Sequence, residues 1–345
     1  MRTMRLILSV SSIIVLLLLV GTAGATPVTA SEGERCVTVT DDLGETVVIR
    51  GTPQRIVSLS PSNTEILYAL GLEDRIVGVT DYCDYPPAAA EKPKVGGYTS
   101  ANIEKVLAAE PDLIFAARKT EDIASRLRAL GMTVISLEPQ TVDDVLGDIE
   151  LVGRATGQEE QASACIKELQ ERIQAVTGKI ENLAERPSVA HIVWYDPLWV
   201  SGRGTFQNEV ITMTGGTNAF GSVEEWSIVS LEELITTDPD YILVSSGSGM
   251  NRDGYDAVYN YIMNEPRLQG LDAVRNGHVY VVEADVVSRG SPRIVDALEE
   301  VAATLHPDIF GTGTPKATET VQSPGFGTMA LTGALFIVFL IRTKR

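Results

Sequence analysis

The sequence contains few of the residues that build disulfide frameworks or metal centres. Among 345 residues there are only three cysteines and three histidines. Three cysteines allow at most one intramolecular disulfide, which excludes a small fold held together by several bridges. The histidines lie far apart, and none has an i, i+4 or H-E-x-x-H neighbour, so no catalytic or metal-binding histidine cluster is visible. These scarce residues are Cys36, Cys83, Cys165, His191, His278 and His306.

Basic residues are scarce relative to acidic ones. The chain has 28 Lys and Arg against 46 Asp and Glu, which gives a formal net charge of -18. A surface of this charge repels the phosphates of nucleic acids, so nucleic acid is excluded as a partner. With 44% hydrophobic and 21% charged residues, the chain is too apolar for general disorder. Its length allows one or two globular domains.

No catalytic motif is recognisable in the chain. The stretch SSGSG, residues 245–249, follows an apolar run. It lacks the lysine of a phosphate-binding loop and the G-x-S-x-G order of a nucleophile elbow, so a turn is the simpler interpretation. We therefore expect no catalytic residue, no resident cofactor and no metal, and a binding protein is favoured over an enzyme.

The first 25 residues are typical of an export signal. Arg2 and Arg5 precede an apolar run, Leu6 to Val20, and small residues follow from Gly21 to Ala25. This order matches the charged, apolar and cleavage regions of a secretory signal, and we assign residues 1–25 to it. An uncleaved N-terminal anchor uses the same hydrophobicity, so that alternative stays open. Both interpretations place the body of the protein outside the cytoplasm.

Short apolar runs alternate with helical patterns in residues 36–157. The runs RIVSLS, RIVGVT, DLIFAA and TVISLE are typical of buried strands, and each later strand follows a helix-like stretch. After the first, PSNTEILYALG has Pro61 near a helix start and Gly71 at its end. This alternation predicts a parallel α/β lobe. Ahead of it, CVTVTDDLGETVVI indicates a hairpin that turns around residues 42–45.

A long amphipathic helix is predicted next, from Gln158 to about Ala184. Proline is absent there, and apolar residues recur at spacings of three and four. We assign residues 158–186 to a connecting helix that can span two lobes. The α/β pattern then restarts, so residues 187–310 form a second lobe.

Two stretches on either side of this helix match each other. Asn102 to Phe115 and Ser230 to Leu243 share a polar cap, an apolar residue, a glutamate, an apolar pair, an acid followed by Pro-Asp, and a strand. A looser pair runs from Glu65 to Gly71 and from Glu209 to Gly215. We therefore predict two similar α/β lobes joined by one long helix, with a ligand cleft between them. Shared helix-to-strand patterning is the alternative explanation of these matches.

Several motifs together resemble those of a known family. RIVSLSPSNTEILYALGLEDRIVGVTDYCDYPP and KVGGYTSANIEKVLAAEPDLIFA are followed later by SGRGTFQNEVITMTGGTNAF and SRGSPRIVDAL. This ordered set, covering about Cys36 to Phe310, closely resembles the substrate-binding proteins of ABC importers that carry cobalamin, ferric siderophores and haem. The resemblance implies two lobes bridged by one helix, with little movement on binding. Within the family, the cobalamin-binding protein is the nearest match.

The resemblance implies a set of aromatic ligand-binding residues. Carried over position by position, the family's cleft aromatics fall on Tyr82, Tyr98, Trp199 and Trp226. Another cleft tryptophan of the family falls on Ala117, which puts the ligand's identity in doubt. Stacking aromatics suit a wide planar ligand such as a corrin or haem. Tryptophan also serves in hydrophobic cores, and that role stays open for both tryptophans.

The same resemblance implies a polar pair near the C-terminal end of the body, at Asp285 and Arg289. The guanidinium of Arg289 can meet amides, a phosphate or a carboxylate of a ligand. The alternative is a local ion pair between these two residues, worth little if exposed.

Glu104 and Glu232 occupy the same place in the two matching stretches. The resemblance implies that one exposed glutamate on each lobe docks onto arginines of a dimeric permease. Two like charges on two similar lobes suit a partner with two-fold symmetry. A carboxylate in the first turn of a helix also complements the helix dipole, for about 0.3 to 1 kcal/mol, which is the alternative role.

The C-terminal end combines a tether with an apolar segment. Residues 311–323 are rich in Thr, Gly and Pro, which is typical of a flexible tether. Residues 324–345 hold an apolar run with a basic tip, short but sufficient for a membrane span. Pro324, Gly325 and Phe326 before this run resemble the sorting signal of archaeal surface proteins, which is replaced by a lipid anchor. Whether the span is kept or cut stays open.

The sequence as a whole predicts an extracytoplasmic substrate-binding protein. Its expected ligand is cobalamin or another corrinoid, and its expected partners are a dimeric ABC permease with its ATPase. The C-terminal segment is expected to anchor it to the outer face of the cytoplasmic membrane. A ferric siderophore or haem is the alternative ligand, and a surface-attached enzyme on the same scaffold is a further alternative.

Overall fold

The computed structural model describes residues 35–246 and 257–311. The predicted signal (1–25), most of the tether and the apolar C-terminal segment (324–345) lie outside these residues, as do residues 247–249 of the SSGSG stretch. Within the two described ranges, no helix has the length and apolar character needed to cross a membrane.

The first lobe is built on a four-stranded parallel sheet with the strand order β4-β3-β5-β6. The predicted hairpin is confirmed as a separate antiparallel pair, β1 with β2. All four predicted buried runs form strands of the parallel sheet, and almost every residue in them is buried. The strands are β1 (Cys36–Thr40), β2 (Thr46–Arg50), β3 (Ile56–Ser58), β4 (Ile76–Val79), β5 (Leu113–Ala116) and β6 (Val134–Ser136).

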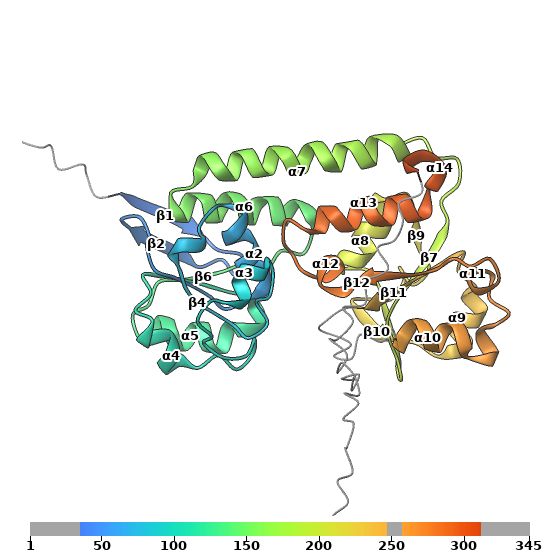
Figure 1. The fold of residues 1–345 in the computed structure, drawn as a ribbon, viewed down its shortest axis with the longest axis horizontal. Coiled ribbons are helices and arrows are strands. Elements are labelled where there is room, and N and C mark those ends of the chain that lie inside the picture. The colour runs from blue at the N-terminus through green and yellow to red at the C-terminus, as the bar shows by residue number, and fades with distance from the viewer. Residues whose placement is uncertain (1–34, 247–256, 312–345) are drawn as a thin grey trace, which may run out of the picture.

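Helices cover both faces of this sheet (Figure 1). They are α2 (Pro61–Ala69), α3 (Pro87–Ala90), α4 (Ile103–Ala108), α5 (Glu121–Ala129) and α6 (Val142–Thr156). Helix α6 begins with a capping box, in which Thr141 and Asp144 each bond the other's backbone N–H. It ends at Gly157, whose left-handed φ of 75° suits glycine.

Helix α7 (Glu159–Ile180) is the predicted connecting helix, and it runs across both lobes (Figure 1). It ends four residues before the predicted limit at Ala184. The apolar spacing continues past the end because Leu183, in the turn that follows, still packs close to Gly215. Helix α6 packs against α7 on the first lobe, and α13 packs against it on the second.

The second lobe has a six-stranded mixed sheet in the order β10-β8-β7-β11-β12, with β9 also paired to β7. Strands β7, β9, β11 and β12 are parallel, and β8 runs antiparallel to both of its neighbours, β7 and β10. The strands are β7 (Ser188–Tyr195), β8 (Leu198–Ser201), β9 (Thr217–Asn218), β10 (Trp226–Ile228), β11 (Tyr241–Ser246) and β12 (Val279–Glu283). The helices are α8 (Phe206–Met213), α9 (Leu231–Thr237), α10 (Ala257–Asn264), α11 (Asp272–Arg275), α12 (Ala284–Ser288), α13 (Ile294–Leu305) and α14 (Pro307–Phe310).

One buried apolar cluster continues from the first lobe into the second. It includes Ile66 of α2, Ile149 of α6, Leu169 of α7, Ile211 of α8 and Leu298 of α13. Because interiors of this kind are close-packed, the two lobes are joined by a shared core as well as by the helix. The predicted architecture, two α/β lobes with a long helix across them, is the one observed.

The matching stretches have matching structures. Helices α4 and α9 both begin at the predicted polar caps, since Asn102 accepts a hydrogen bond from the N–H of Lys105 and Ser230 accepts one from Glu233. Each helix leads into a buried parallel strand, β5 or β11.

Candidate ligand-binding cleft

Two adjoining cavities of about 350 and 440 Å³ lie between the lobes. We call them together the inter-lobe cleft. They share part of their lining, so they form one continuous space: Ser60, Ser62, Tyr98, Lys119 and Ser288 line both.

The first lobe contributes the segments that follow its parallel strands. The chain leaves β3 at Ser60, β5 at Ala117 and β6 at Leu137, and all three residues line the cleft. Strand order reverses between β3 and β5, and such a switch point opens a crevice at the carboxyl ends of the strands. The sheet topology of the first lobe therefore places its half of the cleft.

The second lobe contributes the start of α8, the start of β10 and the end of α12. Phe206, Trp226 and Ser288 come from these three segments. Gly290 follows α12 and lies against the first lobe, where an added Cβ would stand 2.5 Å from Cγ of Pro139. A side chain at this position would push the lobes apart, so glycine allows their close approach.

Three of the four predicted aromatic residues line the cleft. Tyr98 lines both cavities, Tyr82 one of them and Trp226 the other. Tyr82 is 53% exposed and Trp226 42% exposed, so both offer aromatic surface to a ligand. Trp199 does not line either cavity. It lies on β8 opposite Ile228 of β10, on the same face as Trp226.

Ala117 lines the cleft beside Arg118 and Lys119. The smaller side chain, where the resemblance implies tryptophan, therefore leaves room on the first-lobe wall. That room is continuous with the space in front of Trp226, which lines the same cavity.

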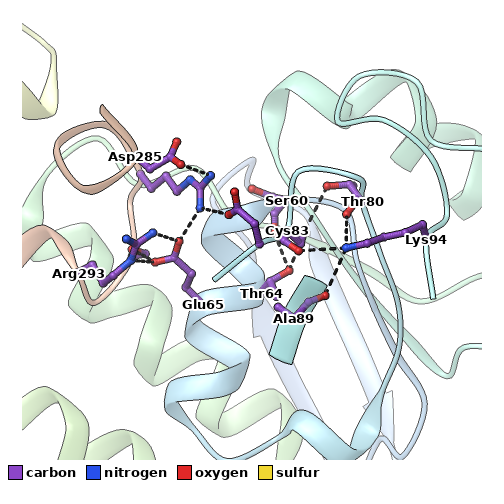
Figure 2. Close-up of polar contacts among 12 residues, drawn as sticks. Ser60, Thr64, Glu65, Thr80, Cys83, Ala89, Lys94, Asp285 and Arg293 are labelled. Carbon is purple, nitrogen blue, oxygen red and sulfur yellow. Dashed lines mark hydrogen bonds and ion pairs between the residues drawn. The ribbon is translucent and has the colours of Figure 1, made fainter. Parts of the chain in front are cut away.

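Arg289 lies at the centre of a group of carboxylates. Its Nη1 is 2.9 Å from Glu65 and 3.0 Å from Asp84, and its Nη2 is 2.8 Å from Asp285. The local ion pair between Asp285 and Arg289 is thus present, but in a cluster that joins both lobes. Figure 2 shows Glu65 and Asp285 on opposite sides of this cluster. Burial alone lowers the pKa of Arg289, but its carboxylate neighbours raise it, so the guanidinium stays charged.

Glu65 was not predicted as a site residue; it does not line the cleft itself, but it contacts the lining residue Arg289 from behind. It is 4% exposed on α2. Its carboxylate also accepts bonds from Arg293 at 2.6 and 2.8 Å (Figure 2). It accepts a further bond from the Ser291 hydroxyl at 2.7 Å. Arg293 in turn stacks over the ring of Tyr85 at 3.8 Å. Its one sequence signal was the match between residues 65–71 and 209–215.

The loop after β4, which carries Tyr82 and Asp84, is held by buried polar contacts. Lys94 donates to the carbonyl oxygens of Thr80, Cys83 and Ala89 at 3.4, 3.1 and 3.3 Å (Figure 2). Thr64 of α2 donates to the Cys83 sulfur at 3.1 Å. The loop is thereby fixed to the first lobe, and Tyr82 is positioned at the mouth of the cleft.

The charged residues that line the cleft are balanced in number. Arg118 forms an ion pair with Glu138 at 2.6 Å, and Arg289 is surrounded by acids. Burial raises the pKa of Asp285, although Arg289 opposes this effect. The cationic lining residues are Arg118, Lys119 and Arg289, and the anionic ones are Glu138, Glu225 and Asp285. The cleft therefore offers aromatic surface and hydrogen-bonding groups without a strong net charge.

Histidine and cysteine do not contribute to the cleft lining. His191 is buried between the hydroxyls of Ser201 and Ser245, and burial lowers its pKa to about 3, so the ring is neutral. The thiols at positions 36, 83 and 165 are free. Among residues 35–246 and 257–311, no group of three or more His, Cys, Asp or Glu side chains could hold a metal ion.

The two glutamates predicted to dock lie on the lobe surfaces. Glu104 is in the first turn of α4 and Glu232 in the first turn of α9, and both are exposed. Figure 1 places both helices on the side of the molecule away from α7.

Comparisons with known proteins agree with this architecture. Residues 56–286 match the family model described as periplasmic binding protein. The chain belongs to the periplasmic binding protein family of ABC transporters. It is 32% identical over 286 residues to YvrC of Bacillus subtilis, an uncharacterized ABC transporter substrate-binding lipoprotein, covering 79% of this chain and 87% of YvrC.

Two further periplasmic binding proteins are similar in sequence and structure. The vitamin B12-binding protein of Vibrio cholerae is 31% identical over 256 residues, covering 73% of this chain and 89% of that protein. Its crystal structure matches with a TM-score of 0.65 at 30% identity, covering 73% and 96%. A possible iron-binding protein of Staphylococcus epidermidis matches with a TM-score of 0.64 at 28% identity, covering 74% and 99%. These relatives are solute-binding proteins rather than enzymes, and the chain is a substrate-binding protein of this family.

Proposed function

We propose that this periplasmic binding protein captures a corrinoid outside the cytoplasm and delivers it to an ABC permease. The observation that carries the proposal is the inter-lobe cleft, which has Tyr82, Tyr98 and Trp226 on its walls and no strong net charge. A corrin has a wide, mostly apolar face with polar groups at its rim, which suits such a lining. The similarity to a vitamin B12-binding protein supports the same ligand class.

The test is a ligand titration of the purified protein, followed by tryptophan fluorescence and by the visible spectrum of any ligand retained from the native source. We expect cobalamin or a precursor corrinoid to quench the fluorescence, because Trp226 lines the cleft. The ligand should be recovered chemically unchanged, because a binding protein does not convert its ligand. If haem or a ferric siderophore binds and no corrinoid does, the ligand assignment is wrong.

Haem or a ferric complex is the second candidate because tyrosine is able to ligate iron. Tyr98 lies inside the cleft and Tyr82 at its mouth. An iron ligand would give a phenolate-to-iron absorption band that disappears in Tyr98→Phe, whereas a corrinoid spectrum would not depend on the phenol oxygen.

We further propose that Glu104 and Glu232 dock the loaded protein onto a dimeric permease. Both carboxylates are exposed in equivalent helices on the two lobes, and α4 and α9 share one side of the molecule (Figure 1). The double variant Glu104→Ala, Glu232→Ala should abolish uptake and leave ligand affinity unchanged, measured by transport in cells and by titration. Glu150→Gln, an exposed change on α6, is the matched control. Normal uptake by the double variant would contradict the docking role.

The anchoring scheme is also a proposal. The apolar C-terminal segment, residues 324–345, would tether the binding body to the outer face of the cytoplasmic membrane beside its permease, either as a retained span or after exchange for a lipid near Pro324. Intact mass of the mature protein distinguishes a retained segment from a processed one.

A further inference from the structure

Both terminal nitrogens of Arg289 have carboxylate partners beside them. Its side chain is 12% exposed, and each of its terminal nitrogens is within 3.0 Å of an acid: Glu65, Asp84 or Asp285. A ligand carboxylate or phosphate that reached Arg289 would therefore also approach these three acids. At separations of a few ångströms, like charges repel strongly unless water fully separates them.

Glu65 has a special position among the three acids. Asp84 and Asp285 are partly exposed, with side chains 47% and 21% accessible, whereas the Glu65 side chain is 2% accessible. Solvent screens buried ion pairs little, so Glu65 offsets the positive charge of Arg289 effectively. Glu65 also neutralises Arg293, which would otherwise add a second positive charge next to Arg289.

We propose that Glu65 determines the charge specificity of the cleft. By pairing with Arg289 and Arg293, it makes the site reject ligands with carboxylates or phosphates at their periphery and accept ligands with amides there. This inference rests on the proposed function of the cleft as a ligand site. Asp84 and Asp285 are partly exposed, so their carboxylates can also accept hydrogen bonds from amide N–H groups of a ligand. Glu65 itself acts as a positioning residue, because it contacts the arginines from the side of α2.

The test compares two ligands that differ by one charge. Cyanocobalamin and its peripheral monocarboxylic acids, in which one rim amide is a carboxylate, are titrated against the full-length protein by fluorescence quenching. We expect the wild-type protein to prefer the amide form by about tenfold, and Glu65→Gln to reduce this preference at least about fivefold. Glu65→Asp, which keeps the charge, should restore most of it. Higher salt should reduce the wild-type preference only slightly because Glu65 is buried.

If Glu65→Gln does not fold, a second variant tests the same proposal. Asp84→Asn removes an exposed acid from the same cluster and should reduce the preference in the same direction by a smaller factor. Equal affinity of the wild type for both forms would overturn the proposal. So would an equal loss of affinity for both forms in Glu65→Gln, since a merely structural role predicts that result.

Failure of the proposed function gives a different result from failure of this inference. If the wild type binds no corrinoid, the corrinoid assignment fails, and haemin is compared with haemin dimethyl ester in the same variants. The inference then predicts that the ester binds more tightly and that Glu65→Gln reduces this difference. Binding of neither pair would overturn both.

Discussion

Asp148 offers a sharp test of how burial controls a charge in this fold. It lies on the inner face of α6, is 2% exposed, and its Oδ2 has no hydrogen-bond partner. Burial, then the neighbouring Asp42 and Asp144, raise its pKa from 3.8 to about 9. In the folded protein it is therefore protonated at pH 7, whereas in the unfolded chain it is ionised. The folded state binds the extra proton between these two pKa values, so stability is full below about pH 4 and falls as pH rises toward 9.

The magnitude follows from the size of the shift. One pKa unit corresponds to about 1.4 kcal/mol, so Asp148 lowers the free energy of unfolding at pH 7 by at most about 4 kcal/mol relative to acid pH. Asp148→Asn replaces the proton by an amide donor of the same shape. We expect the variant to be more stable than wild type at pH 7, and its stability to decline less between pH 5 and pH 8.

Urea unfolding followed by tryptophan fluorescence at pH 5, 6, 7 and 8 measures both effects. The matched control is Glu150→Gln, two residues along the same helix and exposed, which should follow the wild-type pH dependence. Parallel pH profiles for wild type and Asp148→Asn would refute the assignment of a protonated buried carboxyl.

Two further predictions concern the cleft. Gly290→Ala should weaken ligand binding and lower the melting temperature by several degrees, because its Cβ would meet Pro139 at 2.5 Å and Phe206 at 3.1 Å. Gly270→Ala is the control in the same thermal and binding assays, because a Cβ at Gly270 would have nothing within 4 Å. Trp226→Ala should reduce ligand affinity several-fold through lost stacking, and Trp199→Ala should reduce it less because Trp199 does not line the cavities. Equal losses in the two tryptophan variants would place the ligand across both side chains.

Local patterns in the sequence predicted the strands well. The runs that form β3, β4, β5 and β6 are almost continuously apolar, which is typical of strands buried on both faces of a sheet. The hairpin and the caps of α4 and α9 depend on neighbouring residues, so they too were predictable. Helix α6 carries a similar local signal, a capping box at Thr141 followed by apolar residues at spacings of three and four, although it was not among the predicted elements.

The charged centre of the cleft could not be predicted in the same way. Glu65 and Arg293 are 228 residues apart and meet only because the two lobes pack together. In the sequence, Glu65 is one polar residue in a short helix, and nothing local distinguishes it from an exposed one. The resemblance supplied Asp285 and Arg289, but not the acids that surround Arg289.

The two lobes contact each other through equivalent glutamates. Glu65 of α2 and Glu209 of α8 each stand six residues before a glycine with left-handed φ, Gly71 at 68° and Gly215 at 82°. Glu65 crosses to Arg293 of the second lobe, and Glu209 crosses to the first lobe, where it accepts a 2.8 Å hydrogen bond from the N–H of Val142.

These crossings differ in strength and in consequence. Glu209 meets only the N-terminus of α6, where a carboxylate complements the helix dipole, and burial raises its pKa. Glu65 meets two guanidinium groups; removing it would leave Arg289 with Asp84 and Asp285 but Arg293 without a carboxylate partner, and breaking a buried ion pair in this way typically costs about 3 to 5 kcal/mol. Both crossings are made by the protein's own side chains and lie beside the apolar core that the lobes share, so together they fix the lobes at the spacing that shapes the cleft. A ligand therefore enters a preformed site. Binding then loses conformational entropy in the ligand and in the cleft side chains, and it does not require the lobes to close.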